Sequence, residues 1–242
     1  MKNNILTPKH NSNGIFLRQI RSFVCRKGRI TTAQMNAIQK YWSFIGIDFQ
    51  LRPLNLSSIF NCYAPVVLEI GFGSGESLVK NAINFPDKNF LGIEVYKSGI
   101  GSCLNFASAY KVQNLRIIYY DAIEVMHNMI LDHTLSTIQI FFPDPWHKKR
   151  HHKRRLLKNN FLKIIAKKLI INGILHIATD SESYAFYILD EIKDIKNYKN
   201  VSEENNFIKR PISRIATKFE KKGFLQGNKI FDLMFQLKTI DL

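Results

Sequence analysis

Short apolar runs of about five to eight residues alternate along the chain with longer segments in which apolar residues recur every three or four positions. The short runs have the length of buried strands, and the longer segments have the spacing of helix faces packed on a sheet. The predicted strands are Val66–Ile70, Phe90–Val95, Leu115–Tyr119, Thr137–Phe142, Ile174–Ala178 and Ile230–Leu237. Strands and helices in alternation predict an α/β domain with a mainly parallel sheet covered on both faces.

Helices are predicted between these strands and also before the first of them. The connecting helices end near Asn84, run from about Ser98 to Tyr110, carry the apolar face Leu156–Leu169, and continue from Tyr184 to Ile192. An earlier helix is predicted to start at Thr31 or Thr32, either of which can cap it, and to run through Trp42. We expect residues 1–60 to form a basic, helical extension packed on a domain that spans residues 61–242.

The chain is strongly basic, with 35 Lys and Arg against 19 Asp and Glu and a formal net charge of +16. Such a surplus favours a polyanionic partner, because each phosphate that a cation neutralises releases counterions. An AT-biased genome, which encodes Lys and Asn readily, would produce part of the same surplus. The position of the charge therefore matters more than its sum.

Several features predict a cytoplasmic protein without a metal site. The first fifteen residues are polar and lack the apolar core of a signal peptide, and no apolar run approaches the roughly 20 residues that span a bilayer. The three cysteines, Cys25, Cys62 and Cys103, are widely spaced and form no C-x-x-C pair. This arrangement argues against a disulfide framework and against a zinc site.

Acidic side chains recur where the predicted strands end. They are Glu69, Glu94, Asp121, Asp144 and Asp180. Parallel sheets bind their ligands outside the carboxyl ends of the strands, so we expect these side chains to border one site. Glycines at positions 71, 73 and 75 follow the first strand and allow the backbone to turn sharply next to a ligand.

The glycine spacing and the acids together favour an adenosyl cofactor. The spacing is G-x-G-x-G, whereas the dinucleotide fingerprint is G-x-G-x-x-G. Glu94 is placed to accept the hydroxyls of a ribose, as an acid would be in a nicotinamide enzyme. Asp121 can accept from adenine and Glu69 from an amino group, which favours S-adenosylmethionine. A nicotinamide-dependent oxidoreductase and a non-catalytic RNA-binding protein with a relict cofactor fold remain the alternatives.

A proline-flanked acid with a basic tail follows the fourth strand. The prolines at 143 and 145 fix the direction of Asp144. Six of the eight residues from Lys148 to Arg155 are Lys or Arg, and the other two are His, which suits contact with phosphates. The cations around these histidines would repel a metal ion, so the histidines are expected to add to an RNA-binding surface.

Together these segments resemble the bacterial tRNA (guanine-N7-)-methyltransferase family, and the resemblance covers almost the whole chain. It runs through Ile20–Val24, Gly28–Arg29, Leu68–Gly73, Gly92–Val95, Phe142–Trp146, Lys148, Arg150–His151, Lys153–Arg155, Ala178–Asp180, Arg210–Pro211, Thr217–Glu220, Gly223, Gly227 and Asp232. Asn228 and Phe231 stand where the family usually has His and Trp. These departures put C-terminal packing in doubt more than activity.

The resemblance implies a Rossmann-like class I methyltransferase fold with a seven-stranded sheet, S-adenosylmethionine as cofactor and tRNA as partner. It implies methylation of guanosine 46 in the tRNA variable loop to 7-methylguanosine. The cofactor residues would be Glu69, Gly71, Gly73, Glu94, Asp121 and Asp144, of which Asp144 would also be catalytic. The substrate residues would be Lys148, Asp180, Thr217, Lys218, Phe219 and Glu220. RNA contacts would come from Arg150, His151, His152, Lys153, Arg154 and Arg155.

The implied chemistry requires no strong general base. Guanine N7 carries a free lone pair, so holding it in line with the methyl group can supply much of the catalysis. Positive charge moves onto the purine during the transfer, and nearby carboxylates would stabilise it. The hypothesis is therefore that Asp144 positions and stabilises the guanine rather than deprotonating it. For the oligomeric state, a monomer is the expectation.

Overall fold

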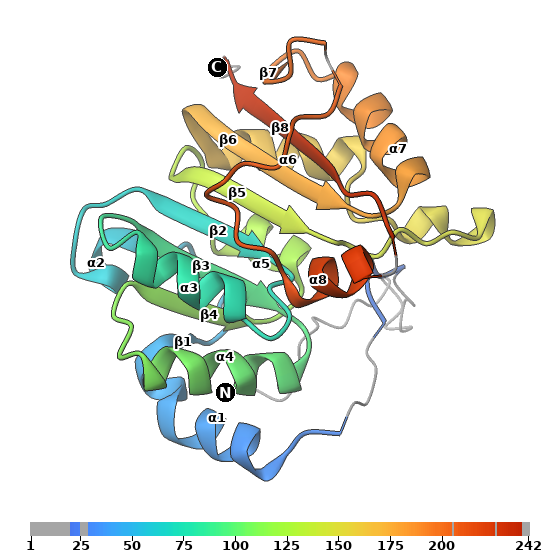
Figure 1. Ribbon diagram of the computed structural model, residues 1–242. Coiled ribbons are helices and arrows are strands. Elements are labelled where there is room, and N and C mark those ends of the chain that lie inside the picture. The colour runs from blue at the N-terminus through green and yellow to red at the C-terminus, as the bar shows by residue number, and fades with distance from the viewer. Residues whose placement is uncertain (1–19, 25–28, 205, 226, 239–242) are drawn as a thin grey trace, which may run out of the picture.

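A twisted eight-stranded sheet runs through the centre of the protein (Figure 1). The computed structural model describes residues 20–24, 29–204, 206–225 and 227–238. The strands lie in the order β1-β4-β3-β2-β5-β6-β8-β7. They are β1 (Gly46–Ile47), β2 (Val66–Ile70), β3 (Asn89–Glu94), β4 (Leu115–Tyr119), β5 (Leu135–Phe141), β6 (Leu169–Thr179), β7 (Tyr198–Asn200) and β8 (Phe231–Leu237).

The predicted α/β architecture is confirmed, with one correction to the strand count. The strands from β1 to β6 pair in parallel, and β8 pairs antiparallel with both β6 and β7. The sheet has eight strands rather than the seven implied by the resemblance. Two residues of the N-terminal extension, Gly46 and Ile47, add β1 beside β4. A strand of two residues is too short to produce a recognisable pattern in the sequence.

Helices cover both faces of the sheet, as expected for parallel strands that are buried on each side (Figure 1). One face is covered by α1 (Thr32–Ile45), α3 (Glu76–Asn84) and α4 (Lys97–Ala109). The other is covered by α2 (Leu56–Phe60), α5 (Ala122–Asn128), α6 (Asn159–Lys168) and α7 (Glu182–Lys193). A last helix, α8 (Lys218–Leu225), lies across the carboxyl ends of the central strands in Figure 1. No helix in the described part of the chain has the length and apolar character needed to cross a membrane.

The N-terminal extension is built into these layers. Thr31 caps α1, as predicted, and forms a reciprocal capping box with Gln34. Gln34 also donates from Nε2 to Ser102 Oγ on α4 at 2.9 Å. Gly101 allows this close approach, because a Cβ there would lie 2.6 Å from the carbonyl oxygen of Gln34. The division of the chain at residues 60 and 61 stays a prediction.

Candidate active site

A pocket of about 590 Å³ lies at the carboxyl ends of β2, β3 and β5. Five of the six expected cofactor residues line it, namely Glu69, Gly71, Gly73, Glu94 and Asp144. Asp121 does not reach the wall, although its neighbours Tyr120 and Ala122 do. Of the five strand-end acids expected to border one site, Glu69, Glu94 and Asp144 line this pocket, whereas Asp121 and Asp180 do not.

The glycine loop between β2 and α3 forms one wall of the pocket. Gly71 and Gly73 have φ angles of +78° and +59°, a left-handed conformation that glycine adopts without strain. A Cβ built on either of them would meet nothing within 4 Å. On the other side of the loop, a Cβ on Gly99 would lie 2.2 Å from the carbonyl oxygen of Gly73. The loop is thus packed tightly against α4 and open towards the pocket.

Glu69 is a buried carboxyl with unused bonding capacity. It is 2% exposed, and its Oε2 has no hydrogen-bond partner among the described residues. Burial raises the pKa of Glu69 to about 8, with a further rise from the neighbouring Glu94 and an opposing effect from a hydrogen bond with Ser77. A buried acceptor without a partner is costly, so this position favours a ligand that brings a donor or a positive charge.

Glu94 connects the end of β3 to the glycine loop. Its Oε2 accepts from the backbone N–H of Gly73 at 2.7 Å, and its Oε1 accepts from Val95 and Tyr96 at 2.5 and 2.9 Å. Burial raises the pKa of Glu94, and these backbone hydrogen bonds act in the opposite direction. Three of the roughly four acceptor positions of the carboxylate are used. One position on Oε2 remains for a ligand hydroxyl.

An N-terminal strap, residues 20–24, lies along the pocket and binds Asp121. Arg21 donates from Nη1 to Asp121 Oδ2 at 2.9 Å, while Asp121 Oδ1 caps α5 through the N–H of Ile123. Ser22 and Phe23 of the strap line the pocket. Two further hydrogen bonds hold the strap, from Trp146 Nε1 to the carbonyl oxygen of Ser22 and from the Tyr96 hydroxyl to that of Val24. Sequence reasoning assigned no role to the strap beyond its basic character.

Asp144 lies in a turn whose two ends carry unusual backbone conformations. Phe142 and Trp146 have φ angles of +52° and +50°, which are rare for bulky side chains. The turn is anchored by the Phe142 N–H, which donates to the carbonyl oxygen of Ala178, and by Arg155 Nε, which donates to that of Pro145. Strained residues of this kind persist only where the surrounding structure holds them, and they gather at functional sites.

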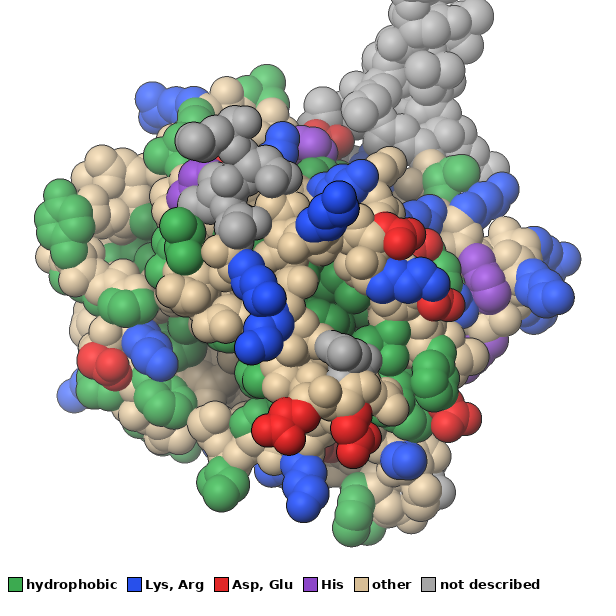
Figure 2. Space-filling view, turned by 90° about the horizontal axis from the view of Figure 1, so that it is seen from above, with side chains coloured by type: hydrophobic (Ala, Val, Ile, Leu, Met, Phe, Trp, Pro, Cys, Tyr) green, Lys and Arg blue, Asp and Glu red, His purple; other side chains and the backbone are tan. Residues whose placement is uncertain are grey.

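The basic segment after this turn forms η1, a 3-10 helix spanning Lys149–Arg154. None of its side chains is buried. Lys, Arg and His side chains gather on the side of Figure 2 that corresponds to the yellow coil of η1 in Figure 1. Trp146 supports the segment, because the Arg154 guanidinium lies 5.2 Å from its ring centre and the His151 ring packs edge-on at 5.8 Å. Partial desolvation and neighbouring cations, beginning with Arg150, lower the pKa of His151.

Arg155 differs from the five residues that precede it. Its side chain was expected on the RNA surface, but the residue is only 4% exposed. Its guanidinium lies 4.4 Å from the ring centre of Tyr187 and 4.9 Å from that of Tyr184. The apolar stem and planar head of arginine suit such a buried aromatic site. Arg155, at the end of η1, thus packs this segment against the tyrosines of α7.

Among the described side chains, only two of the six expected substrate residues line the pocket. Thr217 and Phe219 line the pocket, whereas Lys148 and Asp180 lie outside its wall. Asp180 directly follows β6, and the N-cap position of α7 is Ser181, whose side chain makes no capping hydrogen bond. The side chain of Lys218 lies outside the described part of the structure.

Glu220 belongs to a buried charge network. Arg214 donates from Nη1 and Nη2 to the two oxygens of Glu220 at 2.7 and 2.8 Å. Arg214 Nη2 also bonds Asp232 Oδ2 at 3.0 Å, and Asp232 Oδ1 lies 2.9 Å from His176 Nε2. All four residues are at most 5% exposed. The sequence offered no pattern for Arg214, because its partners come from separate elements.

Known proteins resemble this chain over nearly its full length. A family model described as "Putative methyltransferase" matches residues 63–233. The tRNA (guanine-N(7)-)-methyltransferase of Buchnera aphidicola subsp. Acyrthosiphon pisum (strain Tuc7) is 81% identical, over 98% of this chain and 100% of the relative. The chain belongs to the tRNA (guanine-N(7)-)-methyltransferase family. The member from Salmonella typhimurium is 48% identical, over 98% of this chain and 99% of the relative.

Membership of this family removes the nicotinamide-dependent oxidoreductase and the relict RNA-binding protein from consideration. Solved structures support the fold independently. The crystal structure of the 16S rRNA methyltransferase KamB superposes with a TM-score of 0.55 at 12% identity, covering 92% of this chain and 100% of that one. The eight-stranded sheet of this family member is therefore a Rossmann-like methyltransferase sheet.

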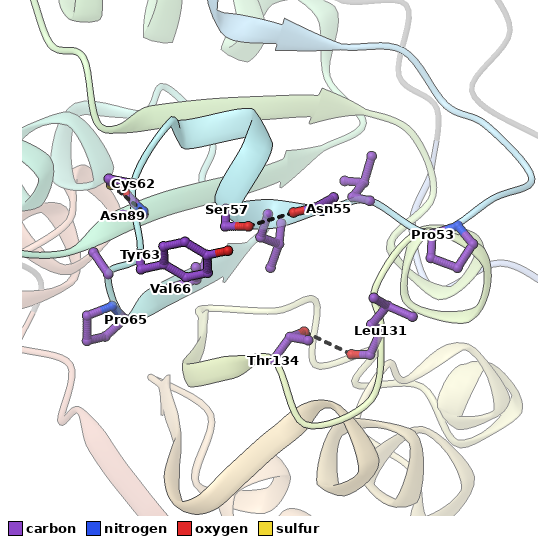
Figure 3. A pocket seen from close by; sticks show the side chains of 13 residues that line it. Pro53, Asn55, Ser57, Cys62, Tyr63, Pro65, Val66, Asn89, Leu131 and Thr134 are labelled. Atoms are coloured by element: carbon purple, nitrogen blue, oxygen red, sulfur yellow. Dashed lines mark hydrogen bonds between the residues drawn. The ribbon is translucent and has the colours of Figure 1, made fainter.

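A second pocket, of about 680 Å³, lies at the opposite edge of the sheet, where β2 and β3 begin (Figure 3). Its polar contacts are neutral hydrogen bonds, such as Ser57 Oγ to Asn55 Oδ1 at 2.7 Å and Thr134 Oγ1 to the carbonyl oxygen of Leu131 at 2.9 Å. No group of three or more His, Cys, Asp and Glu side chains in the described residues is arranged to hold a metal. The buried acids Glu69 and Glu94 line the other pocket, at the carboxyl edge of the sheet.

Proposed function

We propose that this protein transfers a methyl group from S-adenosylmethionine to N7 of guanosine 46 in the variable loop of tRNA. One observation carries the proposal beyond the family name. The pocket combines the unpartnered Oε2 of the buried Glu69 with Asp144, and the turn that holds Asp144 leads directly into the cationic η1. There, the carboxylates complement a cationic cofactor and the N–H donors of a purine, and the cations of η1 complement an RNA backbone.

The described residues fit the cofactor. Glu69 Oε2 would accept from the α-ammonium group, and the remaining acceptor position of Glu94 would take a ribose hydroxyl. Asp121, held by Arg21, would lie at the adenine end. The open sides of Gly71 and Gly73 let the backbone approach the ligand closely. When bound, S-adenosylmethionine supplies an electrophilic methyl group on a sulfonium.

The residues around the guanine orient it and stabilise its charge. N7 attacks with its own lone pair, so Asp144 would accept from the N–H donors of the base and offset the positive charge that develops. Thr217 and Phe219 would hold the base from the α8 side. Both oxygens of Glu220 are bound by Arg214, so Glu220 would keep Thr217 and Phe219 in place. Lys148 and Asp180 would contact the substrate outside the pocket.

The accessible basic side chains of η1, next to the pocket, would bind the tRNA backbone. We assign this contact to Arg150, His151, His152, Lys153 and Arg154, with Arg155 anchoring the segment. Phosphate contacts position the substrate without reading its sequence. We expect the protein to act in the cytoplasm, on folded tRNA and as a monomer.

A single assay tests the proposal. The purified protein is incubated with S-adenosylmethionine and an unmodified tRNA transcript, and 7-methylguanosine is mapped by reduction and aniline-induced strand cleavage. Cleavage at position 46 alone is expected, and a transcript with adenosine at that position should remain intact. Methylation at another position, or none with several tRNAs that carry guanosine 46, would refute the proposal.

A further inference from the structure

Two phenylalanine rings, those of Phe142 and Phe219, line the pocket and lie nearly parallel to each other. The ring centres of Phe142 and Phe219 lie 6.5 Å apart, and their planes are inclined by 25°. Phe49 and Tyr120 show the directly stacked case in the same molecule, with centres 3.7 Å apart and planes inclined by 4°. A flat base stacked between two rings, in contact with one face of each, needs ring centres about 7 Å apart. The centre-to-centre distance between Phe142 and Phe219 is within about 1 Å of that spacing.

The backbone holds both rings in place, although the rings themselves are accessible. Phe142 adopts its strained φ of +52° and donates its N–H to the carbonyl oxygen of Ala178 at 2.7 Å. Phe219 precedes Glu220, which Arg214 binds through two hydrogen bonds. Phe219 is nevertheless 70% exposed, which is a large apolar area to leave in water beside a pocket. This combination is typical of a preorganised stacking surface.

We propose that Phe142 and Phe219 form an aromatic slot that holds the target guanine between their faces and stabilises the positive charge it acquires. The inference rests on the proposed function. In the transfer, the bond from the methyl carbon to N7 forms as its bond to sulfur breaks. Sulfur keeps the electron pair and becomes neutral, no proton moves, and the purine takes the positive charge. An aromatic face attracts a positively charged base more strongly than it attracts a neutral one. The slot therefore favours the product-like transition state, in which the guanine carries positive charge.

Substitution at position 219 tests the slot through single-turnover rates at saturating cofactor and tRNA. Phe219→Leu keeps an apolar side chain without a π face, and the rate should fall by about 3- to 30-fold. Phe219→Tyr should retain the rate within about threefold. Phe224, on the same helix and 77% exposed, does not line the pocket and supplies the matched control as Phe224→Leu. An unchanged rate in Phe219→Leu would overturn the proposal.

Fluorination separates charge stabilisation from shape. Fluorinated phenylalanines incorporated at position 219 weaken the negative face of the ring in steps while nearly preserving its size. The logarithm of the rate should fall in proportion to that weakening. If pentafluorophenylalanine at position 219 supports the wild-type rate while leucine does not, the slot acts through shape alone and the charge role is wrong.

A fluorescence readout keeps the slot distinguishable from the proposed function. A tRNA with 2-aminopurine at the target position is bound in the presence of S-adenosylhomocysteine. Stacking between two rings should keep the probe quenched with the wild type, and Phe219→Leu but not Phe224→Leu should brighten it. If the wild-type protein forms no 7-methylguanosine, the proposed function fails. If the wild-type protein does form 7-methylguanosine but the probe responds equally to Phe219→Leu and Phe224→Leu, only the proposal of the slot fails.

Discussion

Arg21 Nη1 lies 2.9 Å from Asp121 Oδ2, and this ion pair ties the N-terminal strap to the start of α5. Both side chains are largely buried, with exposed fractions of 18% and 5%. The same strap carries Phe23 into the pocket wall and offers its Ser22 carbonyl oxygen to Trp146. The strap therefore connects the adenine end of the proposed cofactor site to the residue that supports η1.

Replacing Arg21 should weaken cofactor binding because the pocket wall loses its anchor. Arg21→Met is expected to raise the Kd for S-adenosylmethionine about 3- to 10-fold, equivalent to roughly 1 kcal/mol for a part-buried ion pair. Titration calorimetry measures this directly. Arg21→Lys preserves the charge and should recover most of the affinity. Equal or tighter binding by Arg21→Met would mean that the strap competes with the cofactor for Asp121.

Two of the strand-end acids could be placed from the sequence, because their position follows from topology. A parallel strand delivers its last residue to one edge of the sheet, so a reading of strand ends located Glu69 and Glu94 in one pocket. Asp121 was expected at the same site, but it does not line the pocket, and its two oxygens bond the Ile123 N–H and Arg21. Nothing local in the sequence predicts a contact between residues 100 positions apart.

Other features were not predictable because they depend on tertiary neighbours. In the basic run, Arg155 looks the same as Arg154, yet one lies between tyrosines and the other on the surface. Short elements such as β1 and α5 contain too few residues for a periodic signal. The strained Phe142 could be recognised only from its dihedral angle.

Glu69 should make the stability of the free protein depend on pH. Its folded-state pKa, about 8, lies above the value of 4.5 for the free side chain, so the folded state holds an extra proton between these pH values. Stability therefore falls as pH rises through this window. Glu69→Gln should raise Tm at pH 8 by roughly 5 °C and change it little at pH 5. Differential scanning calorimetry at both pH values checks this, with the exposed Glu203→Gln as control.

Asp144 should contribute to the rate without acting as a base. Asp144→Asn is expected to lower the single-turnover rate about 100-fold, because a carboxylate that offsets developing charge is lost. The wild-type rate at saturating cofactor and tRNA should stay flat between about pH 6.5 and 8.5. A rate that rises tenfold per pH unit in the wild type, or a wild-type rate in Asp144→Asn, would contradict the positioning role.

The exposed cations of η1 should govern the salt dependence of tRNA binding. Arg150→Gln is expected to weaken binding and to reduce the slope of log K against log salt concentration by about 1, since one phosphate contact is lost. Filter binding over a range of KCl concentrations provides the slope. Lys111→Asn is the matched control, because Lys111 is exposed in the turn after α4 and asparagine tolerates its φ of +53°. A similar loss of slope in both variants would place the RNA elsewhere.

Arg214 should be the most sensitive position for stability outside the apolar core. Arg214→Met leaves the buried carboxylates of Glu220 and Asp232 without their shared cation, which should cost about 3–5 kcal/mol. Arg210 also contacts Glu220, at 3.3 Å, but its side chain is 46% exposed, so Arg210→Met should cost about 0–1 kcal/mol. Urea unfolding of both variants compares the two losses. If both variants unfold at the same urea concentration, the buried network does not hold the segment that carries Thr217 and Phe219.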